Sequence, residues 1–102
     1  MTRFRLTPLA EADLEKIVDY VAGEASPDRA EAVLADILST AERLAESPGI
    51  GHARPDLSDE DVRFWSVHRY LIVYHPDSAP LEIVRVVHGA REPGALGREI
   101  GS

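Results

Sequence analysis

Polar and apolar residues alternate over the first positions of the chain and then change to a helical spacing. Residues 3–7 read Arg-Phe-Arg-Leu-Thr, which has the two-residue period of a half-buried strand. Thr7-Pro8 is a typical helix start, because threonine can accept a hydrogen bond from a free amide and proline suits the first helical position. Apolar residues then follow at helical spacing, at Leu14, Ile17, Val18 and Val21. The pattern predicts a short strand and a helix that Gly23 weakens at its end.

A second and stronger helical pattern follows Ser26-Pro27, which repeats the start signal. Its apolar stripe consists of Ala30, Val33, Leu34, Ile37, Leu38, Ala41, Leu44 and Ala45. The sequence Glu-Ser-Pro-Gly at positions 46–49 ends it. Because the link between the two helices is short, they are expected to form an antiparallel hairpin with facing apolar stripes.

After a loop over residues 50–61, the pattern becomes that of strands. Residues 62–68, 69–75 and 81–88 are rich in Val, Ile, Tyr, Trp and Phe, and the segment at 75–80 is a proline-containing turn. We predict an antiparallel meander, with the first strand at an edge. The fold class is therefore α+β in the order β-α-α-β-β-β, with the helix hairpin packed on one face of a small antiparallel sheet. The other face is expected to stay open for a macromolecular ligand.

Composition and charge narrow the possibilities. The chain has 102 residues and is interpreted as one domain over residues 1–92 with a Gly-rich tail at 93–102. The absence of cysteine excludes disulfides and thiol chemistry. The net charge is −7, and residues 8–47 carry ten acidic against three basic side chains, whereas residues 62–91 carry four arginines against two acids. An anionic partner would have to be bound by this second half. No apolar run suits a bilayer span or a signal peptide, so a cytoplasmic location is expected.

The candidate chemistry does not favour an enzyme site. Three histidines, His68, His75 and His88, lie on predicted strands, but no carboxylate stands at a recognised ligand spacing beside them, so neither a metal nor a cofactor is predicted. No serine lies in a nucleophile elbow. Gly49-Ile50-Gly51 follows a helix and lacks the context of a phosphate-binding loop.

The arginines are the other candidates. Strand alternation places Arg63 and Trp65 on one face, while Arg85 points opposite to its neighbours and Arg91 follows the last strand. One interpretation gathers these arginines into a patch on the uncovered face, where guanidinium groups grip carboxylate or phosphate. The alternative is that they are solvated or pair with acids on the helices. Trp65 and Tyr70 are core residues by default, and anchors for a partner if they face the open side.

Four segments of the chain together resemble a known group of proteins. They are Leu-Thr-Pro-Leu-Ala-Glu-Ala-Asp-Leu at 6–14, Ser-Pro-Gly at 47–49, Arg-Tyr-Leu-Ile-Val-Tyr at 69–74, and Ile-Val-Arg-Val-Val-His-Gly-Ala-Arg-Glu at 83–92. In this order and at this length they resemble the RelE/ParE toxin superfamily, and the ParE branch in particular. The resemblance implies the β-α-α-β-β-β fold and a ParD-like antitoxin with a ribbon-helix-helix domain. The antitoxin's disordered C-terminal segment would fold onto the toxin in a hetero-oligomer, which contacts operator DNA only through the antitoxin.

The resemblance also implies an activity. ParE-like members inhibit DNA gyrase by direct binding, without a catalytic site. The alternative is a RelE-like, ribosome-dependent messenger endoribonuclease, which would use Arg69, Arg85, His88 and Arg91. Against it, the chain has one lysine, no tyrosine after Tyr74 and an apolar run at 71–73. A third hypothesis is an inactive member that binds its antitoxin and serves operon autoregulation. The candidate partner-binding residues are Arg63, Trp65, Arg69, Tyr70, His88 and Arg91.

Overall fold

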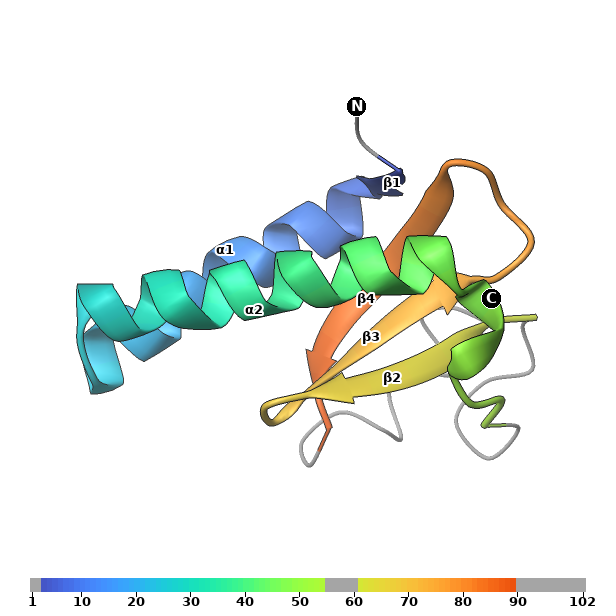
Figure 1. Cartoon of the computed structure of the whole chain (residues 1–102). Coiled ribbons are helices and arrows are strands. Elements are labelled where there is room, and N and C mark those ends of the chain that lie inside the picture. The colour runs from blue at the N-terminus through green and yellow to red at the C-terminus, as the bar shows by residue number, and fades with distance from the viewer. Residues whose placement is uncertain (1–2, 55–60, 90–102) are drawn as a thin grey trace.

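The computed structural model describes residues 3–54 and 61–89, which form two layers, a helix hairpin and a four-stranded sheet (Figure 1). The elements are β1 (Phe4–Leu6), α1 (Pro8–Glu24), α2 (Pro27–Glu46), the 3₁₀ helix η1 (Pro48–Ile50), β2 (Arg63–Val67), β3 (Tyr70–His75) and β4 (Leu81–His88). The predicted order β-α-α-β-β-β is confirmed. The predicted tail at 93–102 lies outside the described residues.

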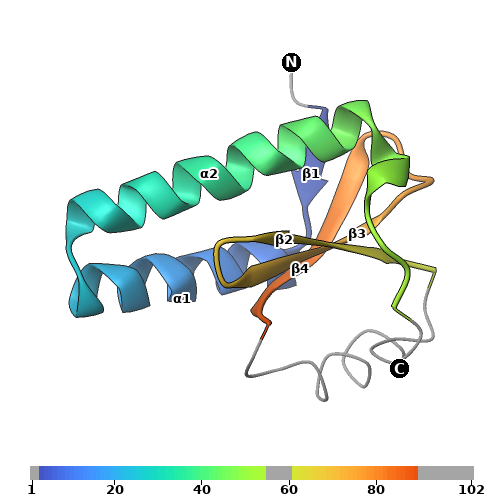
Figure 2. The same cartoon turned by 60° about the horizontal axis from the view of Figure 1, so that its bottom comes forward.

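Both helices begin where the sequence predicts. The Thr7 hydroxyl accepts a hydrogen bond from the Ala10 amide at 3.1 Å, and the Ser26 hydroxyl accepts one from the Arg29 amide at 3.1 Å. These bonds satisfy amides that have no partner within the helix. In Figures 1 and 2 the two helices run antiparallel on one side of the sheet, and the end at which they are joined extends beyond it.

The sheet has the strand order β1-β4-β3-β2. β2, β3 and β4 form the predicted antiparallel meander, and β1 lies at an edge as expected. However, β1 pairs with β4 in parallel, so the sheet is mixed and the prediction of a purely antiparallel sheet is wrong in this respect. A tight turn would have fixed β1 antiparallel to its neighbour, but a whole helix hairpin separates β1 from the meander, and such a crossover permits parallel pairing.

The main core lies between the helix hairpin and the sheet. Its helical side is formed by Leu14, Ile17, Val33, Ile37 and Leu44, and its sheet side by Tyr70, Ile72, Tyr74, Ile83 and Val86. The side chain of Tyr74, the largest of the fully buried ones, lies in this core. The stripes predicted for the two helices therefore face the sheet as well as each other. Within the described residues, no helix is long and apolar enough to span a bilayer.

The opposite face of the sheet is not the open surface that the sequence pattern suggested. Phe64, Val73 and Val87 form a second apolar cluster with Val62, and each is at most 4% exposed. Alternation along β2 did separate Phe64 from Trp65 correctly, but Trp65 lies on the side of the helix-facing core. The expectation of an uncovered face is wrong for these residues, because alternation assigns side chains to faces but does not show whether a face is buried.

Candidate functional site

Three of the predicted site residues lie together at one end of the sheet. Arg69 is in the β2–β3 turn, Tyr70 begins β3, and His88 ends β4 directly opposite Tyr70. The Gly89 amide donates to the Arg69 carbonyl at 3.0 Å, which holds the end of β4 beside the turn. Among the other predicted residues, Arg63, Trp65 and Arg85 do not join this group, while Arg91 lies outside the described residues.

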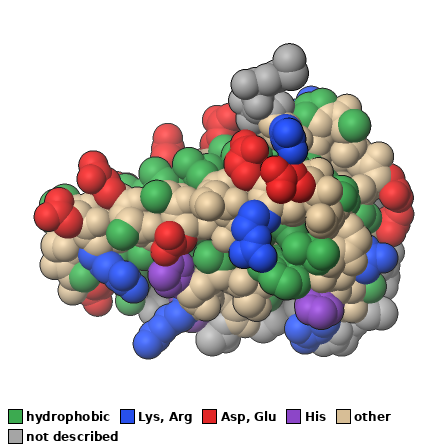
Figure 3. Space-filling model, in the orientation of Figure 1, with side chains coloured by type: hydrophobic (Ala, Val, Ile, Leu, Met, Phe, Trp, Pro, Cys, Tyr) green, Lys and Arg blue, Asp and Glu red, His purple; other side chains and the backbone are tan. Residues whose placement is uncertain are grey.

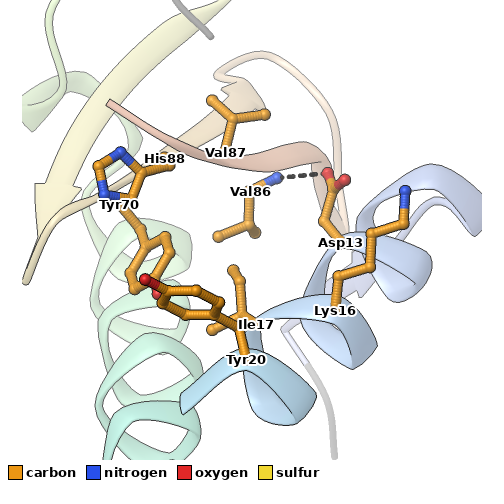
Figure 4. Close-up of a pocket in the computed structure, with 8 residues that line it drawn as sticks. All are labelled: Asp13, Lys16, Ile17, Tyr20, Tyr70, Val86, Val87 and His88. Atoms are coloured by element: carbon orange, nitrogen blue, oxygen red, sulfur yellow. Dashed lines mark hydrogen bonds between the residues drawn. The ribbon is translucent and has the colours of Figure 1, made fainter. Parts of the chain in front are cut away.

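Two cavities are both lined by Tyr70 and His88, whose ring centroids are 5.7 Å apart in an edge-to-face arrangement. The first, of about 260 Å³, is lined further by Asp13, Lys16, Ile17, Tyr20, Val86 and Val87 (Figure 4). The second, of about 410 Å³, is lined further by Ser66, His68, Arg69, Leu71 and Gly89. We call this pair of cavities the Tyr70–His88 site. Concave, partly apolar surfaces with a few polar groups are typical of binding sites.

Charge around the Tyr70–His88 site differs from that of the helix hairpin. Lys16 and Arg69 are exposed and line the site, while the Asp13 carboxylate is buried and engaged by Arg85. On the face shown in Figure 3, acidic side chains lie along the helical part, and arginine and histidine side chains are more frequent towards the sheet. The site is therefore a locally basic and aromatic surface on an acidic chain, suited to an anionic partner.

Arg85 forms a buried ion pair with Asp13. Its Nε and Nη2 atoms donate to the two carboxylate oxygens at 2.8 and 2.9 Å, and the Val86 amide donates to the same carboxylate at 2.9 Å. Arg85 is 7% exposed and Asp13 8%. This two-pronged geometry satisfies the carboxylate, so the pair fixes α1 against β4.

The ion pair corrects the expectation that Arg85 belongs to an exposed arginine patch. For Arg85 the alternative interpretation is confirmed, because this arginine pairs with an acid on a helix. Sequence reasoning missed Asp13 as the partner. The available signal was that Asp13 lies four residues before Ile17, and so on the apolar stripe of α1, where a carboxylate needs a hydrogen-bond partner.

Asp13 also completes the edge of β4. β1 pairs with β4 only along Leu81–Ile83. Beyond it, the Thr7 hydroxyl donates to the Val84 carbonyl at 2.7 Å, and Asp13 accepts from the Val86 amide. Side chains from the start of α1 thus replace a strand along this edge, which protects backbone groups that would otherwise be open. The first cavity begins where this protection ends.

Trp65 and Arg63 lie on β2 and contact the segment that follows α2. The Trp65 ring is stacked on His52 with centroids 5.9 Å apart and an interplanar angle of 11°. Arg63 donates to the Gly51 carbonyl at 3.0 Å. His52 forms an isolated bridge with Phe64. Arg63 therefore holds this segment in place, and Trp65 offers a half-buried ring at its margin.

Tyr74 also holds the segment that follows α2, through hydrogen bonds to Pro48 and Gly51. Its hydroxyl donates to the Pro48 carbonyl at 2.6 Å and accepts from the Gly51 amide at 3.0 Å. Burial raises the pKa of Tyr74 above its usual value of 10.0, while the Gly51 amide and the Arg63 guanidinium act in the opposite direction. The native state consequently holds the phenol proton more tightly than the unfolded chain does.

This shift gives an alkaline pH dependence. The stabilisation from Tyr74 is complete below pH 10 and is lost as the pH rises through the higher native-state pKa. We expect Tyr74→Phe to lower the free energy of unfolding at pH 8 by about 1–3 kcal/mol, because the buried Gly51 amide and the partly buried Pro48 carbonyl lose their partner. It should also flatten the loss of stability above pH 10. Urea titrations across this range test it, with the exposed Tyr20→Phe as control. Equal alkaline slopes in the two variants would contradict the assignment.

The described residues do not assemble the ribonuclease alternative. Of its four residues, Arg69 and His88 come together, Arg85 is engaged by Asp13, and Arg91 is outside the described part. In residues 3–54 and 61–89, no three histidine, aspartate or glutamate side chains are grouped as a metal site would need. Chemically, the Tyr70–His88 site offers cations, aromatic edges and apolar surface, which are means of binding.

Comparison with known proteins agrees with this architecture. The family model described as "ParE toxin of type II toxin-antitoxin system, parDE" matches residues 4–93. A solved structure, "Chromosomal ParDE TA system from P. aeruginosa", is similar in fold, with a TM-score of 0.70 and 23% identity, covering 83% of this chain and 92% of that one. No curated protein matches. Because the family model spans nearly the whole described region, the chain belongs to the ParE toxin family of type II toxin–antitoxin systems.

Proposed function

We propose that this ParE-family chain is a toxin that inhibits DNA gyrase by direct binding and is neutralised by a ParD-like antitoxin. Family membership supports the general role. The observation that carries binding rather than catalysis is the Tyr70–His88 site, a basic and aromatic surface with two cavities. Inhibition by binding needs no reacting groups, and a net charge of −7 is no obstacle to contact with another protein.

The antitoxin is proposed to cover this site with a C-terminal segment that is disordered when free. Such a segment folds as it binds and can therefore wrap a wide surface of a small protein. Arg69, Tyr70 and His88 would contact it, with Trp65 and Arg63 at a second area along β2 and Arg91 near the C-terminus. The resulting hetero-oligomer would bind operator DNA through the antitoxin's ribbon-helix-helix domain. A cytoplasmic location follows from these partners.

Arg85 favours the binding role over a ribonuclease. A ribonuclease needs cations around the scissile phosphate, and they must be free to meet it. Here Arg85 is 7% exposed and its guanidinium holds the Asp13 carboxylate. Moving the Arg85 guanidinium to a substrate phosphate would leave the buried Asp13 carboxylate without its cation. We therefore propose that the chain is not an enzyme.

Induced expression of the chain, alone and with its antitoxin, tests this proposal. We expect growth to stop without the antitoxin and to resume with it. In a translating extract, messenger should stay intact when the purified chain is added. Cleavage of messenger would establish the ribonuclease alternative instead. Unchanged growth without antitoxin would indicate an inactive member that serves only operon autoregulation.

A further inference from the structure

The smaller cavity of the Tyr70–His88 site has the dimensions of a pocket for one side chain. Its volume is about 260 Å³. Benzene fits an apolar cavity of about 150 Å³, so an aromatic side chain has room here. Figure 4 shows Ile17 and Val86 between the rings of Tyr20 and Tyr70 on one side and Lys16 on the other. The floor is thus apolar and one wall is aromatic, which favours an aromatic guest that meets ring edges.

One face of α1 supplies half of the residues that line this cavity. Asp13, Lys16, Ile17 and Tyr20 stand at intervals of three, one and three residues, so they share one side of α1. Because Arg85 already engages the Asp13 carboxylate, the charge presented at the rim is that of the Lys16 ammonium. Lys16 is exposed, and it is the chain's single lysine. The rim therefore favours a carboxylate and disfavours a second cation.

We propose that this cavity binds an aromatic side chain of the antitoxin, placed so that a neighbouring carboxylate meets Lys16. This inference rests on the proposed function for the identity of the partner, and it adds the chemistry that the partner must carry. Filling the cavity places the guest against Ile17 and Val86 and beside Tyr70, while the ion pair sets its orientation. The aromatic group acts as the anchor, because buried aromatic side chains carry much of the binding energy in other interfaces.

The inference is testable with a small probe that has both groups. 3-Phenylpropionate carries an aromatic ring and a carboxylate, and 3-phenylpropanamide is its neutral counterpart. With the full chain labelled on methyl groups for NMR, we expect the carboxylate probe to shift the signals of Ile17 and Val86 with millimolar affinity. The amide should bind about two- to fivefold more weakly, which is the range for a single exposed ion pair.

Two charge-matched variants separate the pocket from general electrostatics. Lys16→Gln should reduce the affinity for 3-phenylpropionate to that for the amide and leave the amide unaffected. Arg29→Gln removes the same charge from the start of α2 and should change neither affinity. Lys16 is exposed and its contact with the cavity is at the rim, so the substitution should leave the fold intact, as thermal unfolding would verify.

Three results would overturn the inference. One is the absence of shifts at Ile17 and Val86 with either probe at tens of millimolar. Another is equal affinity for the two probes, with no response to Lys16→Gln. The third is a shift of the same signals with protein concentration alone, which would assign the cavity to a second copy of the chain. Any of these results would show that the cavity does not bind the antitoxin as proposed. If the antitoxin still neutralised the chain, the proposed function would be unaffected.

Discussion

Asp13→Ala is expected to destabilise the protein by about 3–5 kcal/mol, because it leaves the Arg85 guanidinium buried without its carboxylate. The Val86 amide loses its acceptor at the same time. A small domain has about 5–15 kcal/mol of net stability. A substantial fraction of the molecules should therefore be unfolded at physiological temperature. Denaturant titration followed by circular dichroism measures the loss.

Two further variants show whether the cost comes from the buried pair. Asp19→Ala removes an exposed acid from the same helix and should change stability by less than about 0.5 kcal/mol. Replacing both partners, as Asp13→Leu with Arg85→Met, should recover much of the loss, because no buried charge then lacks a partner. If Asp13→Ala were no more costly than Asp19→Ala, the ion pair would not fix α1 to β4 as described.

The second large effect is expected at Gly51. A Cβ atom there would lie 2.2 Å from the Tyr74 hydroxyl oxygen and 2.9 Å from two of its ring carbons. Tyr74 cannot withdraw easily, since it is fully buried and its hydroxyl is bonded to Pro48 and to Gly51 itself. Gly51→Ala should therefore lower the free energy of unfolding by about 1–3 kcal/mol or more.

Gly49 offers a matched control, two positions away, because a Cβ there has no atom within 4 Å. Gly49→Ala should be tolerated, and urea midpoints of the two variants make the comparison. Combining Gly51→Ala with Tyr74→Phe should cost less than the sum of the single changes, since the closest contact disappears with the hydroxyl. Equal midpoints for Gly49→Ala and Gly51→Ala would mean that the loop shifts freely, contrary to its anchoring by Tyr74.

Local signals in the sequence were sufficient for most of the secondary structure. Thr7 and Ser26 begin the helices because a capping hydroxyl and a following proline act within a few residues. The β2–β3 turn was less visible. The sequence pattern placed His68 and Arg69 in consecutive strands, whereas the structure uses both as a turn, with His68 at a φ of 54° and bonded to Asp36 of α2. Histidine adopts this backbone region less readily than glycine, so no common turn signal marked it.

Long-range pairings were beyond the reach of pattern reasoning. The Asp13–Arg85 ion pair joins residues 72 positions apart, and the parallel pairing of Phe4 with Leu81 spans a similar separation. Periodicity identifies which side of an element is buried but not which partner lies opposite it. For the same reason Tyr70 and His88 could be listed as candidates, while their contribution to two cavities with Lys16 became evident only in the folded chain.

The most direct measurement of the central claim, that this chain acts by binding gyrase, is a DNA supercoiling assay with purified components. Relaxed plasmid, ATP and gyrase are incubated with increasing amounts of the chain, with and without its antitoxin. The account predicts that supercoiling is lost as the chain approaches saturation and returns when the antitoxin is added. Normal supercoiling at saturating amounts of folded chain would contradict it.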